Sequence, residues 1–220
     1  MAIIDIIIIA ALGGFVFLRL RSQLGNKSGT EHLPPRADRS KHNDTQDIDS
    51  YGRPIDAKPD GDSIVELESN SALRRVFQDI RQIDRSFNTA QFLSGAEGAY
   101  RMILEAFWSG NSATLKEFLS EDICNQFVGA VDARADVGHT LDNRLLEVES
   151  SKIVEAQLDN QIAELTVQFT SEILAVTRDS DGVIIEGDAS DAVIVNDQWV
   201  FSRNISSRDP KWILVATRTG

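Results

Sequence analysis

The spacing of the apolar residues changes at Gly138, and this change limits the fold more than any other feature of the sequence. Before Gly138, apolar residues recur at three- and four-residue steps, as in "FLSGAEGAYRMILEAFWSG". After Gly138 they alternate with polar residues, as in "AELTVQFTSEILA". The first pattern is typical of amphipathic helices and the second of half-buried antiparallel strands. Helices followed by a meander of strands predict an α+β domain.

Turn residues divide the part after Gly138 into about four strands. The dipeptides at 159–160 (Asp-Asn), 181–182 (Asp-Gly) and 209–210 (Asp-Pro) have the composition of tight turns. The last two strands then read "VNDQWVFSRN" and "KWILVAT". Their inward positions are predicted to be Trp199, Phe201, Trp212 and Leu214. We therefore expect the end of the chain to close the sheet over the helices.

A further amphipathic helix is predicted for residues 64–87, just before the domain. Its apolar residues fall near a period of 3.6; they are Ile64, Leu67, Leu73, Val76, Phe77, Ile80, Ile83 and Phe87. Its opposite face is charged and carries Arg74, Arg75, Asp79, Arg81, Asp84 and Arg85. Two interpretations stay open: the helix packs on the domain, or it binds a partner or a membrane surface.

Residues 1–20 form the most apolar stretch of the chain, and from Met1 to Leu18 only Asp5 is charged. A helix of this length rises about 27 Å, close to the thickness of a hydrocarbon core. A secretory signal peptide needs a basic start and a small-residue cleavage site, and this stretch has neither. We predict a transmembrane anchor whose apolar residues are Ile3, Ile4, Ile6, Ile7, Ile8, Ile9, Leu12, Phe15, Val16, Phe17 and Leu18.

The residues after the anchor predict its orientation. Arg19 and Arg21 follow the apolar stretch directly, and under the positive-inside rule they place the N-terminus outside and the domain in the cytoplasm. Residues 21–63 hold four of the five prolines and few apolar residues. Such a stretch buries too little surface to offset its chain entropy, so a disordered polar linker is predicted there.

Charge is distributed unevenly along the chain. From Thr89 to the end there are 10 Lys+Arg and 21 Asp+Glu, a net charge of −11 out of −12 for the whole chain. An acidic surface of this kind repels phosphate backbones, so nucleic acid binding is not expected. The single cysteine, Cys124, has no intrachain disulfide partner and is predicted to be a small core residue.

Few residues fit catalysis or metal binding. His139 is the one histidine of the domain and follows Gly138 at the junction of helix and strand, where a loop role is expected. The stretch "EGDASD" lacks the ligand spacing of a calcium hand, and the sequence has no glycine-rich phosphate loop. No catalytic residue, metal or cofactor is therefore predicted.

Four blocks after residue 90 occur in a familiar order and spacing. They are "FLSGAEGAYRMILEAFWSGN", "TLKEFLSEDI", "VTRDSDGVIIEGD" and "WVFSRNISSRDPKWILVAT". Together they resemble the C-terminal domain of the Tim44 family, named after subunit forty-four of the mitochondrial inner-membrane translocase. We assign residues 88–220 to this domain. The short apolar N-terminus and polar linker resemble the bacterial, membrane-anchored members of that family.

The resemblance carries implications for fold and partners. It implies a cone-shaped fold similar to the nuclear transport factor two-like folds, with a curved antiparallel sheet around helices and an apolar pocket. It implies membrane contact through the first helices of the domain, which correspond to about residues 89–109 and 112–119. Mitochondrial members tether a heat-shock chaperone to the protein-conducting channel through a long charged N-terminal region. Here about 65 residues of linker and helix replace that region, so the domain and the membrane link carry over better than chaperone tethering.

Candidate binding residues follow from the predicted cone. Some aromatic residues of the domain could line its pocket, although core packing is the favoured explanation for most of them: Tyr100, Phe107, Trp108, Phe169, Trp199, Phe201 and Trp212. Two arginines near the last turn, Arg203 and Arg208, either pair with nearby carboxylates or form part of a partner surface.

Three functions are compatible with these expectations. The first is a membrane-anchored, non-enzymatic adaptor of the bacterial inner membrane that presents its domain to a chaperone or to translocation or membrane-protein assembly machinery. The second is a module that binds a lipid or another apolar ligand in the cone pocket. The third and least favoured is an enzyme of the cone fold. Self-association stays open in each case.

Overall fold

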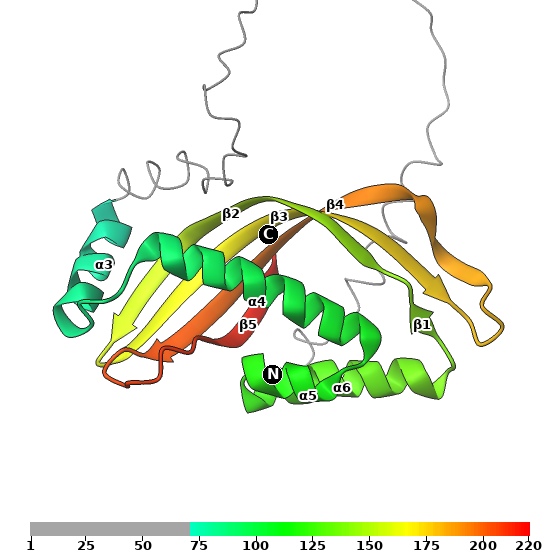
Figure 1. The fold of residues 1–220 in the computed structure, drawn as a ribbon, viewed down its shortest axis with the longest axis horizontal. Helices are drawn as coiled ribbons and strands as arrows, with labels where there is room; N and C mark the ends of the chain where they lie inside the picture. The colour runs from blue at the N-terminus through cyan, green and yellow to red at the C-terminus, as the bar shows by residue number, and fades with distance from the viewer. Residues whose placement is uncertain (1–70) are drawn as a thin grey trace, which may run out of the picture.

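The computed structural model describes residues 71–220 and shows one antiparallel sheet whose inner face is covered by helices (Figure 1). The helices are α3 (Ser71–Ile83), α4 (Thr89–Ser109), α5 (Ser112–Phe118) and α6 (Glu121–Asp136). The strands are β1 (Thr140–Leu141), β2 (Arg144–Asp159), β3 (Ile162–Arg178), β4 (Ile184–Asn204) and β5 (Ile213–Thr219). The α+β class predicted from the change of period is thus confirmed.

Several predictions concern residues outside the described part. The anchor at 1–20 with Arg19 and Arg21, the linker at 21–63 and the start of the helix predicted at 64–87 all lie there. Within residues 71–220, no helix is long and apolar enough to cross a membrane.

Strand β3 is the centre of the sheet. One edge of β3 pairs with β2 and then with the short β1, and its other edge pairs with β4, which in turn pairs with β5. The sheet therefore has five strands instead of the expected four, because the chain makes a two-residue pairing at Thr140 and Leu141 before β2 begins. A pairing this short has no alternation of its own to reveal it in the sequence.

The predicted alternation in β3 is present. Its inward residues are buried, and they are Ala163, Leu165, Val167, Phe169, Ser171 and Ile173. The register places Leu165 opposite Phe201, and Val167 opposite Trp199. Residues directly opposite each other in an antiparallel pair lie on the same face. The aromatic residues of β4 therefore face the helices, as predicted.

The β3–β4 hairpin contains a large irregularity. Leu174 pairs with Ala192, but Val176 pairs with Gly187, so one residue of β3 faces four residues of β4. Gly187 has a φ of +85°, and a Cβ atom placed on it would lie 1.9 Å from the carbonyl oxygen of Ala175. Only glycine fits this position without displacing the neighbouring backbone. The bulge bends the outer half of the hairpin away from the rest of the sheet (Figure 1).

Helix starts differ from the predicted ones. In the sequence, Ser94 with Glu97 and Thr114 with Glu117 have the spacing of a capping box, which predicts that helices begin or restart at Ser94 and Thr114. Instead α4 begins after Asn88, whose side chain accepts a hydrogen bond from the Gln91 N–H at 2.9 Å. Asn111 caps α5 in the same way through the Thr114 N–H. Asparagine is as good a cap as serine, and it lies earlier in the chain at both sites.

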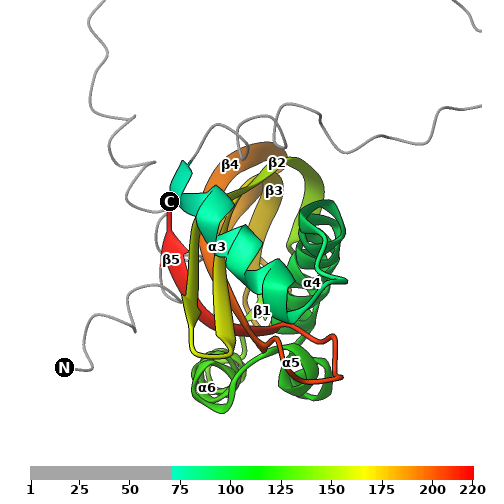
Figure 2. The same ribbon diagram turned by 90° about the vertical axis from the view of Figure 1, so that its left-hand side faces the viewer.

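Helix α3 packs on the end of the domain, beside β2 (Figure 2). Its buried residues are Leu73, Phe77 and Ile80. The Phe77 ring lies 6.0 Å from that of Phe87, in the connection to α4. The described part of this helix thus joins the core of the domain.

Arg134 of α6 ties the end of α4 to the second layer of helices. Its Nη2 donates to the carbonyl oxygens of Phe107 at 3.0 Å and Trp108 at 3.2 Å, and its guanidinium lies 5.3 Å from the centre of the Phe107 ring. These carbonyls belong to the last turn of α4, where the helix dipole favours a positive charge. The arginine thus replaces hydrogen bonds that the helix end lacks.

Substituting Arg134 with methionine is expected to destabilise the fold by about 1–2 kcal/mol, because two carbonyls lose a charged donor while the apolar stem is kept. Thermal unfolding of the two proteins measures the difference. Arg101→Met on the exposed side of α4 is the matched control and should leave the melting temperature within about a degree. Equal losses for both substitutions would contradict this role of Arg134.

Candidate functional site

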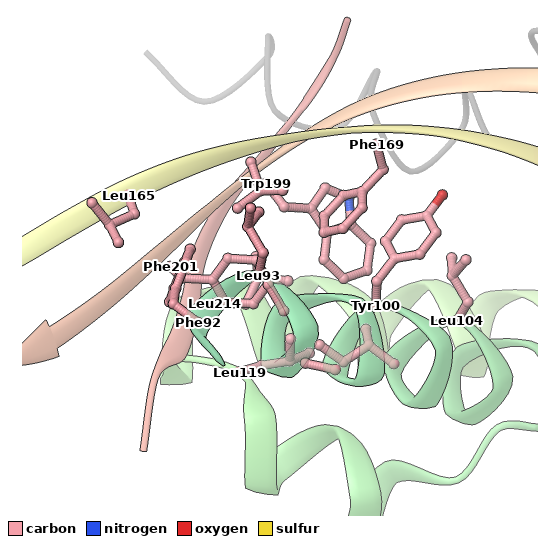
Figure 3. Packing of buried hydrophobic residues seen from close by; sticks show 14 of the residues in the cluster. Phe92, Leu93, Tyr100, Leu104, Leu119, Leu165, Phe169, Trp199, Phe201 and Leu214 are labelled. Atoms are coloured by element: carbon pink, nitrogen blue, oxygen red, sulfur yellow. The ribbon is translucent and has the colours of Figure 1, made fainter. Parts of the chain in front are cut away.

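The centre of the core is an aromatic group between α4 and the sheet (Figure 3). Tyr100 of α4 stacks on Phe169 of β3 with 4.3 Å between ring centroids, and it meets the edge of Trp199 at 4.6 Å. Trp199 lies 6.4 Å from Phe201, its inward neighbour on β4. The apolar spacing of α4 and the alternation of β3 and β4 bring these four rings together.

Polar groups lie inside this aromatic layer. The Tyr100 hydroxyl donates to Oδ2 of Asp197 at 2.8 Å and lies 2.9 Å from Oγ of Ser171. Tyr100 and Ser171 are fully buried, and Asp197 is 8% exposed. We call these three residues the buried polar cluster. Because α4, β3 and β4 each contribute one member, the cluster fixes the position of the helix over the sheet.

Burial controls the ionisation of the cluster. Loss of hydration raises the pKa of Asp197 to about 6, although the hydrogen bond from Tyr100 acts in the opposite direction. Burial, followed by the nearby charge of Asp197, raises the pKa of Tyr100 above its ordinary value. The tyrosine therefore stays protonated and acts as a donor. The carboxyl group of Asp197 is the member of the cluster that changes charge near neutral pH.

Sequence reasoning missed Asp197, although the signal was present. The alternation that turns Trp199 and Phe201 inward also turns Asp197 inward, because it lies two residues before Trp199. A carboxylate at an inward strand position is unusual, since buried charges are costly without partners. A second polar contact, from the Ser151 hydroxyl of β2 to Glu97, lies one helical turn before Tyr100 on α4.

The seven candidate pocket residues do not form one group. Tyr100, Phe169, Trp199 and Phe201 are together in the centre. Phe107 packs against Phe127 of α6, with 5.2 Å between ring centroids, and Trp108 is buried at the same end of α4. Trp212 is half-buried at the other end, where it contacts Phe87 and Phe92. Six of the seven belong to the buried core itself, and Trp212 packs against it.

The two arginines of the candidate partner surface have different environments. Arg203 donates to Oδ2 of Asp84 at 3.1 Å, and both side chains are nearly buried. It also donates to the carbonyl oxygen of Asp209 and lies 6.0 Å from the centre of the Trp212 ring. Arg203 thus joins the α3–α4 connection to the last loop. Arg208 is exposed in that loop, so it alone of the two is accessible to a partner.

Other candidate chemistry can also be placed. His139 is partly exposed between α6 and β1, away from the buried polar cluster. In the part of the chain that the structure describes, no three His, Cys, Asp or Glu side chains are arranged to hold a metal ion. Cys124 is buried in α6, as expected for a core residue.

Comparison with known proteins identifies relatives of this fold. Residues 73–219 match the family described as "Tim44-like domain". The human mitochondrial import inner membrane translocase subunit TIM44 is 23% identical over 145 residues, which cover 66% of this chain and 32% of that protein. TIM44-1 of Arabidopsis thaliana is 24% identical over 136 residues, 62% of this chain and 28% of the relative. The probable translocase subunit tin-44 of Caenorhabditis elegans is 25% identical over 146 residues, 66% and 34% of the two chains.

This chain therefore matches about a third of the length of these curated relatives. Among solved structures, the intermembrane space region of the chloroplast protein ARC6 aligns with a TM-score of 0.41 and 12% identity. That alignment covers 58% of this chain and 95% of the ARC6 chain.

Proposed function

The chain belongs to the Tim44-like domain family, and we propose on this basis that it is a non-enzymatic adaptor, anchored in a membrane, that presents its domain to protein partners. The observation that carries the proposal is the extent of the match, which runs from α3 to β5 and so includes every described element. The curated relatives are subunits of the mitochondrial import translocase. A role in protein translocation or membrane-protein assembly follows for this chain.

The membrane part of the proposal rests on the sequence. Residues 1–18 carry one charge, Asp5, and are followed by Arg19 and Arg21. A single-pass anchor with the N-terminus outside and the domain in the cytoplasm agrees with this pattern. The relatives are named as inner-membrane proteins, and we place this chain in a bacterial inner membrane.

The geometry of the core supports binding over catalysis. The carboxyl group of Asp197 is held by Tyr100 and covered by aromatic rings, an arrangement that positions α4 on the sheet. A catalytic acid or base has to reach a substrate proton within hydrogen-bonding distance.

In our proposal, the curved sheet over α4 is the cone of a nuclear transport factor two-like fold, and side chains fill its interior.

The alternative function is binding of a lipid or another apolar ligand inside the cone. The close ring contacts among Tyr100, Phe169 and Trp199 favour the adaptor, because a ligand at this place would have to separate them. Mass spectrometry of material extracted from the purified full chain decides between the two. A stoichiometric apolar ligand would favour the alternative.

Crosslinking in native membranes tests the adaptor function directly. A photoreactive residue at Ser207, exposed beside Arg208 in the last loop, is expected to capture proteins of a translocation or assembly machinery. The amount of crosslinked partner should fall strongly with Arg208→Glu. It should be retained with Lys116→Glu, an exposed control on α5. Recovery of this chain alone, from several exposed positions, would contradict the adaptor function.

A further inference from the structure

The exposed face of α3 is basic within an otherwise acidic domain. The exposed charged residues of α3 and of the two residues that follow it are Arg74, Arg75, Asp79, Arg81 and Arg85. Asp84 in the same segment is nearly buried in its ion pair with Arg203. None of the four arginines forms an ion pair with another residue of the part described, 71–220. Beside them, Ile83 is 45% exposed. We call this surface the arginine face.

The β3–β4 hairpin carries the opposite charge. Residues 178–196 contain five carboxylates, Asp179, Asp181, Glu186, Asp188 and Asp191, against one arginine. That arginine, Arg178, is occupied by Asp142 at 2.9 Å. The hairpin surface is therefore strongly negative and has no free cation of its own among these residues.

Exposed apolar side chains lie among the hairpin carboxylates. Val183 is 59% exposed, and its neighbours Ile184 and Ile185 are also exposed. Val137 at the end of α6 is 61% exposed, and the next residue, Gly138, lies against Ser180 in the hairpin turn. Contiguous exposed apolar residues on a soluble surface often mark contact sites. We call this surface the hairpin end.

The arginine face and the hairpin end lie at opposite ends of the domain, as Figure 1 shows. They cannot meet within one molecule, because the full length of the sheet separates them. We propose that the arginine face of one copy of this chain binds the hairpin end of a second copy. The two surfaces carry opposite charges, and each contributes exposed aliphatic side chains: Ile83 on one side and Val183 to Ile185 on the other.

A second copy explains the arginine face better than an anionic membrane does. The domain has a net charge of −11 from Thr89 onward, so bulk electrostatics repel it from anionic lipid. A second copy brings its negative hairpin end to the arginines while the remaining acidic surfaces stay apart. The contact is made by two different patches, so it propagates from head to tail and does not close into a dimer. Since the pairs are exposed, binding is weak and salt-sensitive, and it requires a high local concentration.

Charge exchange tests the proposal on the full chain in mild detergent. The charge of the arginine face is reversed by R74E/R81E, which replaces two arginines seven residues apart on α3. The hairpin end is reversed by D181K/D191K, because the carboxylates of Asp179 and Asp188 hold local turns and are left intact. The experiment is run at low salt, where the Debye length is about 10 Å or more. Under this condition the sedimentation coefficient of the unchanged chain is expected to rise with protein concentration.

Each variant alone should lose this rise, and an equal mixture of the two should recover it, because the glutamates of one variant then face the lysines of the other. R101E/K116E changes the net charge as much as R74E/R81E does, but lies on α4 and α5, and should behave like the unchanged chain. Circular dichroism checks that every variant is folded.

Three outcomes of the sedimentation experiment would overturn the proposal. The unchanged chain stays monomeric at every concentration, the control variant loses association as well, or the mixture fails to recover it. Flotation with vesicles that contain anionic lipid tests whether the arginine face binds a membrane instead. Vesicle binding that R74E/R81E removes, with self-association unchanged, would assign the arginine face to the membrane and contradict the contact between copies.

Discussion

Replacing Gly187 with alanine is expected to lower the free energy of unfolding by about 4 kcal/mol or more, or to prevent folding of the hairpin altogether. The position has a φ of +85°, and the new Cβ would lie 1.9 Å from the Ala175 oxygen and 2.9 Å from its carbonyl carbon. Both contacts are with backbone in the neighbouring strand, so no side-chain rotation relieves them. Urea denaturation followed by circular dichroism measures the loss.

Gly182 provides the matched control for this prediction. Its φ is +80°, nearly the same as that of Gly187, but nothing lies within 4 Å of a Cβ placed there. Gly182→Ala therefore reports the backbone cost alone, about 1–2 kcal/mol. A similar loss for both substitutions would show that the close approach at Gly187 relaxes without cost, and the bulge would then not depend on glycine for space.

Replacing Asp197 with asparagine is expected to stabilise the protein at neutral pH by about 2 kcal/mol. The folded pKa of Asp197, about 6, lies above the ordinary carboxyl value of 3.8. The folded state therefore favours the protonated form, and its stabilising effect is complete below pH 3.8 and lost as the pH rises through 6. A difference of about 2 pKa units corresponds to about 3 kcal/mol of destabilisation by the charged carboxylate. The cost of burying the asparagine amide offsets part of the gain from removing that charge.

Unfolding at two pH values tests this sign. The gain from Asp197→Asn should be present at pH 7.5 and largely absent at pH 4, because both side chains are then neutral. Asp191→Asn, on the exposed part of β4, should show little change at either pH. A variant that is less stable than the unchanged protein at pH 7.5 would mean that Tyr100 and Ser171 stabilise the charged carboxylate more than burial destabilises it.

Local patterns in the sequence were sufficient to predict the classes of the elements. The alternation in β3 and β4 placed Phe169, Trp199 and Phe201 on one face, and the structure brings them together beside Tyr100. This succeeded because the side-chain period of a strand depends on geometry that every strand shares.

Features that depend on distant parts of the chain were not predictable in this way. The ion pair of Asp84 with Arg203 joins residues 119 positions apart, and nothing in either neighbourhood indicates the other. The bulge at Gly187 depends on the register between two strands, and the sequence "EGDASD" around it was considered only as a poor match to a calcium-binding loop. The position of Asp197 was predictable from its place in the strand, but its partner Tyr100 lies 97 residues earlier.

The order of the elements has a consequence for how this domain is made. Within residues 71–220 all the helices come before the sheet in the chain, so the face of α4 that packs on β3 and β4 leaves the ribosome before those strands are made. The junction of α5 and α6 is completed only when the Ser120 N–H donates to the Leu214 carbonyl oxygen, 2.9 Å away in β5. Pairings of such long sequence separation form slowly, and uncovered apolar surface invites aggregation. We therefore expect the nascent helices of this protein to be prone to aggregation until the last strand is made.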